Sequence, residues 1–326
     1  MIGESSEGPQ YDIIPGMESN TTRLQFLRNS IAFAGAAFAG LPVRAEFGTN
    51  PSDETIAAWQ RETDLVTPEI YLDYLAGKRP ASGFASLEKL DAAFERILAE
   101  IRTTVVTDVP AVWLVYNMGV IVKTREALVS IDLVHRRACE LVPTLDFALV
   151  THAHSDHYTV PFYRAMNAAH KTVISNFLDN YGAERAKAGT GGFTRVEKEF
   201  RLKDVEIRTS YVDHNPYLVN FTTAFEIRVG KWLFYHSGDC GVATKLRTTW
   251  GRPDLWFFFP GCGVKVPEAY RNVKPRRIAF GHLWELAHDT GCWKGRLSEP
   301  IIKRARGEVL AEGADLFIPF WGERLS

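Results

Sequence analysis

Residues 151–157 (THAHSDH) place three histidines and an aspartate directly after an apolar run, and this stretch constrains the chain more than any other. The apolar run, residues 145–150, has the length and composition of a short buried strand. Thr159, Val160 and Pro161 come next, and a hydroxyl residue before an early proline is typical of a helix start. The four polar side chains are therefore predicted to lie in a loop that leads from a strand into a helix.

The spacing of these side chains predicts a metal site. In extended backbone, residues two apart point to the same side, so His152, His154 and Asp156 are expected to converge. His157 follows where the chain begins to turn, so it can reach a second position close by. Imidazole nitrogen and carboxylate oxygen suit zinc, and also iron or manganese. The alternative is a polar loop whose histidines only form hydrogen bonds, which four such residues in this register do not favour.

Three further residues with side chains of a metal-binding type, His214, Asp239 and His282, each follow a predicted strand. Glycines on both sides of Asp239 allow the backbone to approach a metal closely, and a carboxylate can place one oxygen on each of two cations. His236 competes with His214, but it stands three residues before Asp239, and residues three apart on a strand face opposite sides. We therefore expect His214 in the site and His236 facing away.

The stretch His152 to His157 resembles the HxHxDH signature of the metallo-β-lactamase superfamily of hydrolases in all four positions. The resemblance implies an α/β fold, the four-layer αββα sandwich of that superfamily. It also implies one metal held by His152, His154 and His214, a second held by Asp156, His157 and His282, and Asp239 as the bridging ligand. Asp132 resembles the acidic residue that supports the ligand loop in the superfamily.

The same resemblance implies hydrolysis, with Asp156 and Asp239 as catalytic residues of a dinuclear site. Two divalent ions, expected to be zinc, would share a bridging hydroxide that attacks the substrate. The chain length and the Ser-Gly-Asp segment look most like the ascorbate-6-phosphate lactonase branch, so an ester, lactone or phosphodiester is the expected substrate. The alternatives are a β-lactam hydrolase and a non-catalytic metal-binding envelope protein.

Aromatic and titratable side chains are expected to line the mouth of this site, namely Tyr158, Trp284, Glu285 and His288. His288 is a candidate catalytic residue that donates a proton to the leaving group. Its alternative is a histidine on a helix face that is satisfied by solvent. Trp284 could stack on a substrate ring, and its alternative is a packing role.

The amino terminus predicts export. Arg23 and Arg28 precede the apolar run 31–43, and the chain then reads Val43-Arg44-Ala45, with small residues where a signal peptide is cleaved. The segment also resembles a twin-arginine signal, with Leu24 in place of the second arginine. We therefore expect a periplasmic or extracellular protein whose mature chain starts after residue 45. The alternative is a buried amino-terminal helix; the run is too short to span a bilayer.

The amino-acid composition limits the classes of binding partner that are expected. The chain has 326 residues, 46% of them hydrophobic, and a formal net charge of −1. Nucleic acid is not expected because a phosphate-binding groove would show clustered Lys and Arg. A small-molecule substrate is expected instead. The predicted parts are residues 1–45 (extension and export signal), 46–104 (helical appendage) and 105–326 (metallo-β-lactamase-like domain).

Apolar spacing and turn residues predict secondary structure along most of the chain. Helices are expected at residues 55–63, 68–75, 87–101, 136–141, 161–169 and 300–311. Strands are expected at residues 112–124, 127–131, 145–150, 172–175, 205–212, 224–229, 232–235, 255–259, 276–280 and 316–320. His135 is interpreted as a surface or capping histidine.

The four cysteines, Cys139, Cys240, Cys262 and Cys292, are widely spaced and form no CxxC pair. In an exported protein they could pair in three ways. Cys240 directly follows Asp239 and could approach the metals. Its alternative is a small buried thiol.

Overall fold

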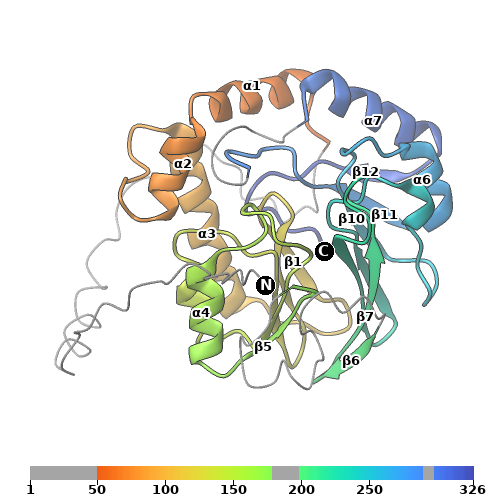
Figure 1. Cartoon of the computed structure of the whole chain (residues 1–326), viewed down its shortest axis with the longest axis horizontal. Helices are drawn as coiled ribbons and strands as arrows, with labels where there is room; N and C mark the ends of the chain where they lie inside the picture. Colours follow the sequence, from red (N-terminus) through yellow and green to blue (C-terminus); the bar gives the residue numbers. More distant parts are fainter. Residues whose placement is uncertain (1–49, 178–197, 289–296) are drawn as a thin grey trace, which may run out of the picture. The chain divides into compact units, whose positions relative to one another are not determined.

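The computed structural model describes residues 50–177, 198–288 and 297–326, in which two β-sheets carry helices on their outer sides (Figure 1). The first sheet has the order β1(Ala111–Tyr116), β2(Gly119–Lys123), β3(Leu128–Ile131), β4(Phe147–Leu149), β5(Thr172–Ile174). The second has the order β12(Asp315–Phe317), β11(Arg277–Phe280), β10(Leu255–Phe258), β9(Trp232–His236), β8(Thr222–Val229), β7(Val205–Val212), β6(Glu199–Leu202). The predicted αββα sandwich is confirmed.

Strand direction brings many strand ends to one edge of the sandwich. In the first sheet β3, β4 and β5 run parallel, while β2 runs antiparallel to β3. In the second sheet β9, β10, β11 and β12 run parallel. Strand β8 is antiparallel to both β7 and β9, so β7 points the same way as β9. Loops that follow β3, β4, β7, β9, β10 and β11, together with the β1–β2 turn, can therefore contribute to one site.

Helices cover the outer faces: α1(Asp53–Asp64), α2(Pro68–Leu75), α3(Ala85–Thr103), α4(Val160–Ala168), α6(Val266–Val273) and α7(Glu299–Ala311). Helix α3 packs on β1 and buries the predicted apolar stripe, including Leu87, Leu90, Phe94 and Ile97. Helix α4 packs on β5, and α7 packs on β12. Helix α1 contacts both α3 and α7, and it lies at the top of the view in Figure 1.

Local sequence explains where the first helices begin. Ser52 caps α1 by accepting a hydrogen bond from the Thr55 amide at 3.2 Å, and acidic residues fill the first turn. Thr67 caps α2, and Pro68 stands in its first turn, where a missing N–H costs nothing. The predicted part boundary at residues 104 and 105 falls between the end of α3 and the start of β1.

One predicted strand is wrong. Residues 112–124 form two antiparallel strands, β1 and β2, because the chain turns at Asn117, whose φ is 48°. Gly119 is required after this turn: a Cβ atom there would lie 2.5 Å from the Asp132 carbonyl oxygen. Strand β6 and helix α6 were also not predicted, and both are short. The glycine-rich stretch 189–192 lies outside the described residues.

The interpretation of His135 as a surface histidine is wrong. His135 is buried, with its ring stacked 4.0 Å from Phe94 and its Nε2 3.1 Å from the Tyr74 hydroxyl. Its Nδ1 does accept a hydrogen bond from the Arg137 amide, so the capping role is present. The expected helix after it is a 3-10 turn, Ala138–Leu141. The tertiary contacts with α2 and α3 explain its burial, and the local sequence did not contain them.

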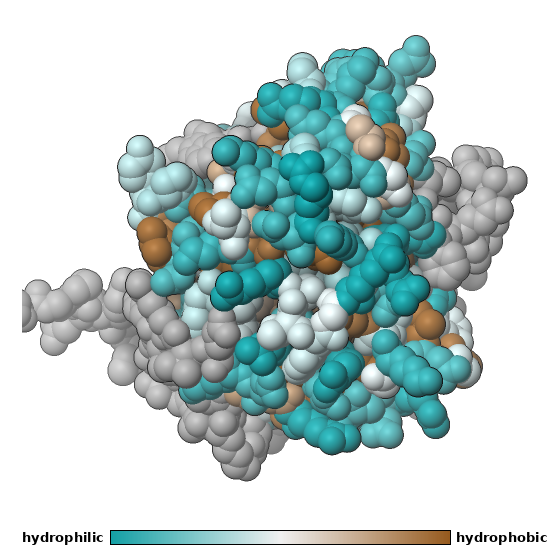
Figure 2. Space-filling view, turned by 90° about the vertical axis from the view of Figure 1, so that its right-hand side faces the viewer, coloured by the Kyte–Doolittle hydropathy of each residue, from teal (hydrophilic) through white to brown (hydrophobic). Residues whose placement is uncertain are grey.

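The outer surface in Figure 2 is mainly hydrophilic, with small separate hydrophobic areas. Within residues 50–177, 198–288 and 297–326, no helix combines the length and the apolar character needed to cross a bilayer. The predicted export signal, residues 21–45, lies outside the described part of the chain.

Candidate metal centre

The predicted ligands meet at the shared strand edge. The HxHxDH stretch follows β4, His214 follows β7, Asp239 follows β9 and His282 follows β11. The structure brings all seven into two adjacent groups. In each group, every residue can offer an atom that lies within 4.8 Å of the atoms offered by the others.

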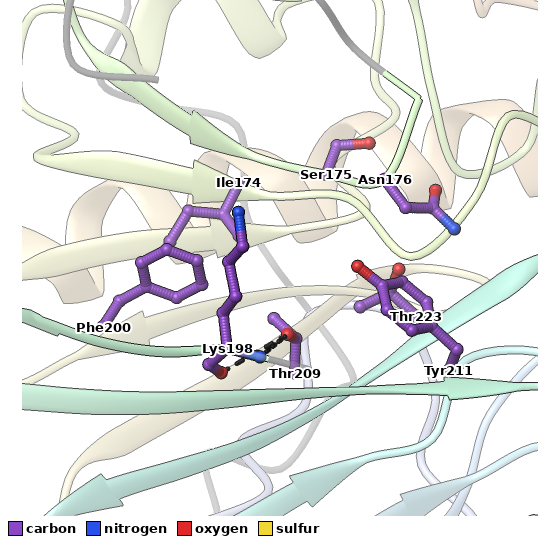
Figure 3. A pocket seen from close by; sticks show the side chains of 8 residues that line it. All are labelled: Ile174, Ser175, Asn176, Lys198, Phe200, Thr209, Tyr211 and Thr223. Carbon is purple, nitrogen blue, oxygen red and sulfur yellow. Dashed lines mark hydrogen bonds between the residues drawn. The ribbon is translucent and has the colours of Figure 1, made fainter. Parts of the chain in front are cut away.

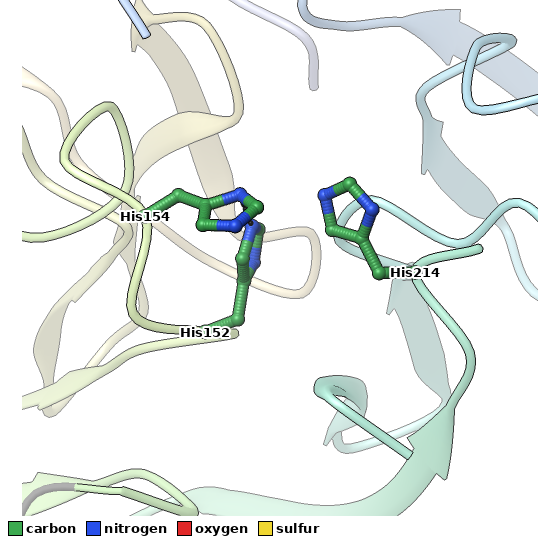
Figure 4. Close-up of side chains that lie close together, drawn as sticks. All are labelled: His152, His154 and His214. Carbon is green, nitrogen blue, oxygen red and sulfur yellow. Dashed lines mark hydrogen bonds between the residues drawn. The ribbon is translucent and has the colours of Figure 1, made fainter. Parts of the chain in front are cut away.

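The first group consists of His152, His154 and His214 (Figure 4). Two of the rings come from the loop after β4 and the third comes from the opposite sheet. His152 Nε2 lies 3.1 Å from His154 Nδ1, and the His214 ring centroid is 5.2 Å from that of His152 and 4.8 Å from that of His154. Three imidazoles therefore converge from both sheets.

The second group consists of Asp156, His157, Asp239 and His282, all buried. His282 Nε2 lies 2.8 Å from an Asp156 oxygen and 3.2 Å from an Asp239 oxygen. His157 Nε2 lies 3.1 Å and 3.4 Å from the same two carboxylates. Asp239 also lies 3.9 Å from His214 Nε2, so its carboxylate stands between the two groups.

The extended register predicted for the histidine stretch ends at His154. The His154 carbonyl accepts hydrogen bonds from the amides of His157 and Tyr158, at 3.0 and 3.1 Å, so the chain turns at once. This turn groups Asp156 with His157 rather than with His152 and His154.

Unpaired donor atoms show that these residues fit metal ions. His157 Nε2, His214 Nε2, both ring nitrogens of His282 and both oxygens of Asp239 are buried without a hydrogen-bond partner. Leaving such atoms unpaired is costly in a protein interior. The close nitrogen–oxygen distances in the second group are not hydrogen bonds by geometry. Divalent cations would satisfy these atoms, and imidazole with carboxylate is a donor set that zinc, iron and manganese accept.

The electrostatics of the two groups differ. Burial lowers the pKa of His152 well below its ordinary value, and burial also lowers the pKa of His214. Burial acts in the same direction on His157 and His282, but neighbouring carboxylates outweigh it and raise the pKa of both well above the ordinary value. Burial alone would raise the pKa of Asp156 and Asp239, yet the adjacent imidazoles hold both well below the ordinary value.

Asp132 holds the ligand loop, as the resemblance implied. Its carboxylate accepts hydrogen bonds from the Thr151 amide at 2.8 Å and the Thr151 hydroxyl at 2.7 Å. It also lies 2.8 Å from His157 Nδ1, and a carboxylate can only accept there. The proton is therefore fixed on Nδ1 of His157, and Nε2 is left as the ligand atom.

His236 faces away from the centre, as predicted. Its Nε2 donates to the Met118 carbonyl oxygen at 2.8 Å, and its Nδ1 accepts from the Gly238 amide. Strand β9 ends at His236, and Gly238 then adopts a φ of 53°. A Cβ atom on Gly238 would lie 2.6 Å from Thr222 Cγ2, so both the backbone and the space require glycine. This turn aims Asp239 at the ligands.

The side chains expected at the mouth have different positions. His288 is buried, and its Nδ1 lies 2.9 Å from a Glu285 oxygen and 3.5 Å from an Asp156 oxygen. The interpretation of His288 as a helix-face histidine satisfied by solvent is therefore wrong. Trp284 is a packing residue: its Nε1 donates to the Pro319 carbonyl and its ring stacks on Phe320. Tyr158 is half-buried and stacks on Tyr163.

Two residues near the ligands were not singled out from the sequence. Asn117, in the β1–β2 turn, donates from Nδ2 to an Asp156 oxygen at 3.2 Å. Cys262, after β10, lies 3.7 Å from His214 Nδ1 and groups with His214 and Asp239. A turn at Asn117 was hidden inside an apolar run. Cys262 could have been found because it follows a predicted strand, as the other ligands do.

Cys240 is buried, and its thiol lies 3.4 Å from the Val242 carbonyl oxygen. Burial raises the pKa of this thiol to about 12. Cys139, Cys240 and Cys262 are free thiols, whereas Cys292 lies outside the described residues. The expected small buried thiol at position 240 is confirmed.

A small hollow lies between the sheets (Figure 3). Its walls come from Ile174 and the residues after β5 on one side, and from Thr209, Tyr211 and Thr223 on the other. Its volume is about 10 Å³, which is room for about one water molecule. None of its lining residues is a candidate ligand.

The αββα sandwich and its strand order define a metallo-β-lactamase fold. The edge that carries the predicted ligands is its candidate metal centre. No protein-family model matches the chain. A UPF0173 metal-dependent hydrolase of Nanoarchaeum equitans is 31% identical over 108 residues. That stretch is 32% of this chain and 50% of the relative, so the match spans about half of the relative's length.

Three solved structures are among those similar to this chain. A metallo hydrolase of Ignicoccus hospitalis is 16% identical, with a TM-score of 0.49 over 66% of this chain and 97% of its own. A metallo-β-lactamase fold protein of Bacillus subtilis is 13% identical, with a TM-score of 0.49 over 67% and 99%. The diiron β-hydroxylase CmlA of Streptomyces venezuelae is 15% identical, with a TM-score of 0.47 over 66% and 53%. These likenesses carry no statement about activity or metal.

Proposed function

We propose that this chain is a metal-dependent hydrolase that uses two divalent cations, with zinc as the first choice. One cation would be held by His152, His154 and His214, and the other by Asp156, His157 and His282, with Asp239 shared. The observation that carries the proposal is the set of buried donor atoms in both groups that have no hydrogen-bond partner. The similarity to the Nanoarchaeum relative, a metal-dependent hydrolase, supports it.

The protein's own residues have defined tasks in this proposal. Divalent cations in such a site activate water near neutral pH and polarise the bond that is hydrolysed. Asp132 and Thr151 orient His157, and Asn117 orients Asp156, because each hydrogen bond fixes one ligand atom in place. Asp239 brings negative charge to both cations. His288 lies beside Asp156 and is proposed to donate a proton to the leaving group.

The proposed substrates are esters, lactones or phosphodiesters of small molecules. The test is a substrate panel of these three classes, run on protein with measured metal content. Chelation should abolish hydrolysis, and zinc or manganese should restore it. A protein that binds two metal equivalents and hydrolyses nothing in the panel would contradict the catalytic proposal and favour a metal-binding role without turnover.

We also propose that the protein is exported, on the pattern of residues 21–45 alone. The amino-terminal sequence of the native protein should begin near Glu46. A cytoplasmic chain that retains residues 31–43 would refute this proposal. Replacement of Arg23 tests whether the twin-arginine-like element is used.

A further inference from the structure

Glu285 lies between two imidazoles next to the second ligand group. It follows β11 by five residues and its side chain is fully buried. One carboxylate oxygen accepts from His288 Nδ1 at 2.9 Å. The other oxygen lies 3.9 Å from His282 Nδ1, and neither of these two atoms has a hydrogen-bond partner. The carboxylate therefore faces Nδ1 of both histidines.

The orientation of the His282 ring indicates a role for the Glu285 carboxylate. His282 Nε2 points at the Asp156 and Asp239 carboxylates, which is the side of the proposed cation. A neutral imidazole that ligates through Nε2 carries its proton on Nδ1, and that proton needs an acceptor. Glu285 is in position to accept it. The present separation is about 1 Å longer than an ordinary N–H···O hydrogen bond.

The fold fixes the backbone on both sides of Glu285. The Trp284 indole donates to the Pro319 carbonyl at 3.0 Å, and the Leu286 amide donates to the Tyr116 hydroxyl at 2.7 Å. Tyr116 is itself buried, with its ring 5.1 Å from that of Tyr71 on α2. Residues on either side of the carboxylate are thus tied to the body of the protein, which sets its position in advance.

We propose that Glu285 is a positioning residue that orients His282 toward the second cation and holds His288 beside it. This inference rests on the proposed function, because it requires a cation on His282. One oxygen of the buried Glu285 carboxylate accepts from His288 Nδ1, and the other has no hydrogen-bond partner. The arrangement becomes favourable when His282 is held by metal and can donate from Nδ1.

The test is Glu285→Gln, which keeps the size and an acceptor oxygen but removes the charge. Metal content is measured by mass spectrometry, and the affinity for each cation by competition with a chelator. One of the two cations should bind roughly 10–100-fold more weakly, as for other losses of a group behind a ligand histidine. The other should be unaffected. The melting temperature of the metal-free variant should equal or exceed that of the metal-free wild type.

Glu226→Gln is the matched control. Glu226 is also buried, but it accepts hydrogen bonds from Thr249 and the Trp250 amide rather than from an imidazole. This control should lower the melting temperature and leave metal affinity unchanged. Glu285→Asp provides a second variant, in which the retained charge lies farther from both rings. It should show a smaller loss of metal affinity than Glu285→Gln.

The outcomes separate the two proposals. A wild-type protein that binds no divalent cation refutes the proposed function itself. If the wild type binds two cations and Glu285→Gln binds both equally well, only the positioning role is wrong. It is also wrong if Glu285→Gln lowers the melting temperature of the metal-free protein without weakening metal binding. Three bound equivalents that fall to two in Glu285→Gln would instead make Glu285 a direct ligand.

Discussion

The two ligand groups differ in charge, and the difference indicates how each would bind a cation. The first group, His152, His154 and His214, offers three imidazoles, and the pKa of His152 and of His214 is lowered by burial. The rings of these two histidines are therefore neutral near pH 7. The second group adds the carboxylates of Asp156 and Asp239, which attract a divalent cation but also retain protons on the neighbouring histidines.

The two groups also differ in the residues that form hydrogen bonds with the ligand side chains. In the second group, His157 is hydrogen-bonded to the Asp132 carboxylate, and Asp156 is hydrogen-bonded to the Asn117 side-chain amide. In the first, His152 Nδ1 lies 2.9 Å from the Thr151 hydroxyl, whereas His214 Nδ1 has the Asn215 amide at 3.5 Å and the Cys262 thiol at 3.7 Å. We infer that His214 is less firmly held than His157.

Asp239→Asn is expected to have the largest effect, because Asp239 serves both groups. The amide keeps the size of the side chain but removes the charge that the two proposed cations would share. Turnover should fall by on the order of a thousandfold, since a cation contributes several kcal/mol of charge stabilisation. Turnover assays and circular dichroism check this. Wild-type turnover in the folded variant, with both cations bound, would contradict the shared role.

His214→Ala should separate the two groups. It removes one of three ligands of the first group, so the protein should retain about one metal equivalent, on the second group, and lose nearly all activity. His236→Ala is the matched control, because His236 is buried in the same region but bonds to the Met118 carbonyl. The control should keep both equivalents. The reverse ranking would mean that His236 is the ligand.

Asp91 and His135 form a carboxylate–imidazole pair outside the candidate metal centre. This pair can be compared with the carboxylate–imidazole pairs of the second ligand group. Burial opposes ionisation of Asp91, but hydrogen bonds with His135, Tyr74 and Arg136 lower its pKa to about 2. The folded pKa is depressed, so the stabilisation is complete above the unfolded pKa and is lost as pH falls towards the folded value. Burial also lowers the pKa of His135, so stability declines as pH falls below about 6.5.

Asp91→Asn should therefore lower the free energy of unfolding by on the order of 1–2 kcal/mol near pH 7. The difference from wild type should shrink as the pH falls from about 4 to about 3. Urea unfolding of both proteins in the presence of a chelator measures this without interference from bound metal. A difference that stays constant over that range would show that the Asp91 charge does not stabilise the fold.

Cys262→Ser should have the smallest effect. The thiol stands 3.7 Å from His214 Nδ1, and a hydroxyl could accept a hydrogen bond from the same nitrogen. Metal affinity should therefore change by less than the roughly tenfold expected for the loss of a group behind a ligand. Chelator competition checks it. Loss of a whole metal equivalent would make Cys262 a ligand in its own right and place sulfur in the first group.

Local sequence patterns were sufficient to predict most of the helices and strands. The apolar stripe of α3, the hydroxyl cap and proline of α2 and the Gly-Lys turn of the β8–β9 hairpin all follow from neighbours in sequence. The run 112–124 was misread because Asn117 and Gly119 look like single interruptions in an apolar strand. Gly119 is required there because a Cβ atom would lie 2.5 Å from the carbonyl oxygen of Asp132, which follows another strand.

The sequence by itself determined the chemistry of this protein. The candidate ligands, the loop after β4 and the strand ends that carry His214, Asp239 and His282 can all be read from residue type and local spacing. Only the tertiary structure decided which donors stand together, which way the ring of His282 turns, and that Glu285 and His288 are buried. These depend on strand direction, on positive φ angles and on contacts between residues far apart in the chain, none of which a local pattern contains.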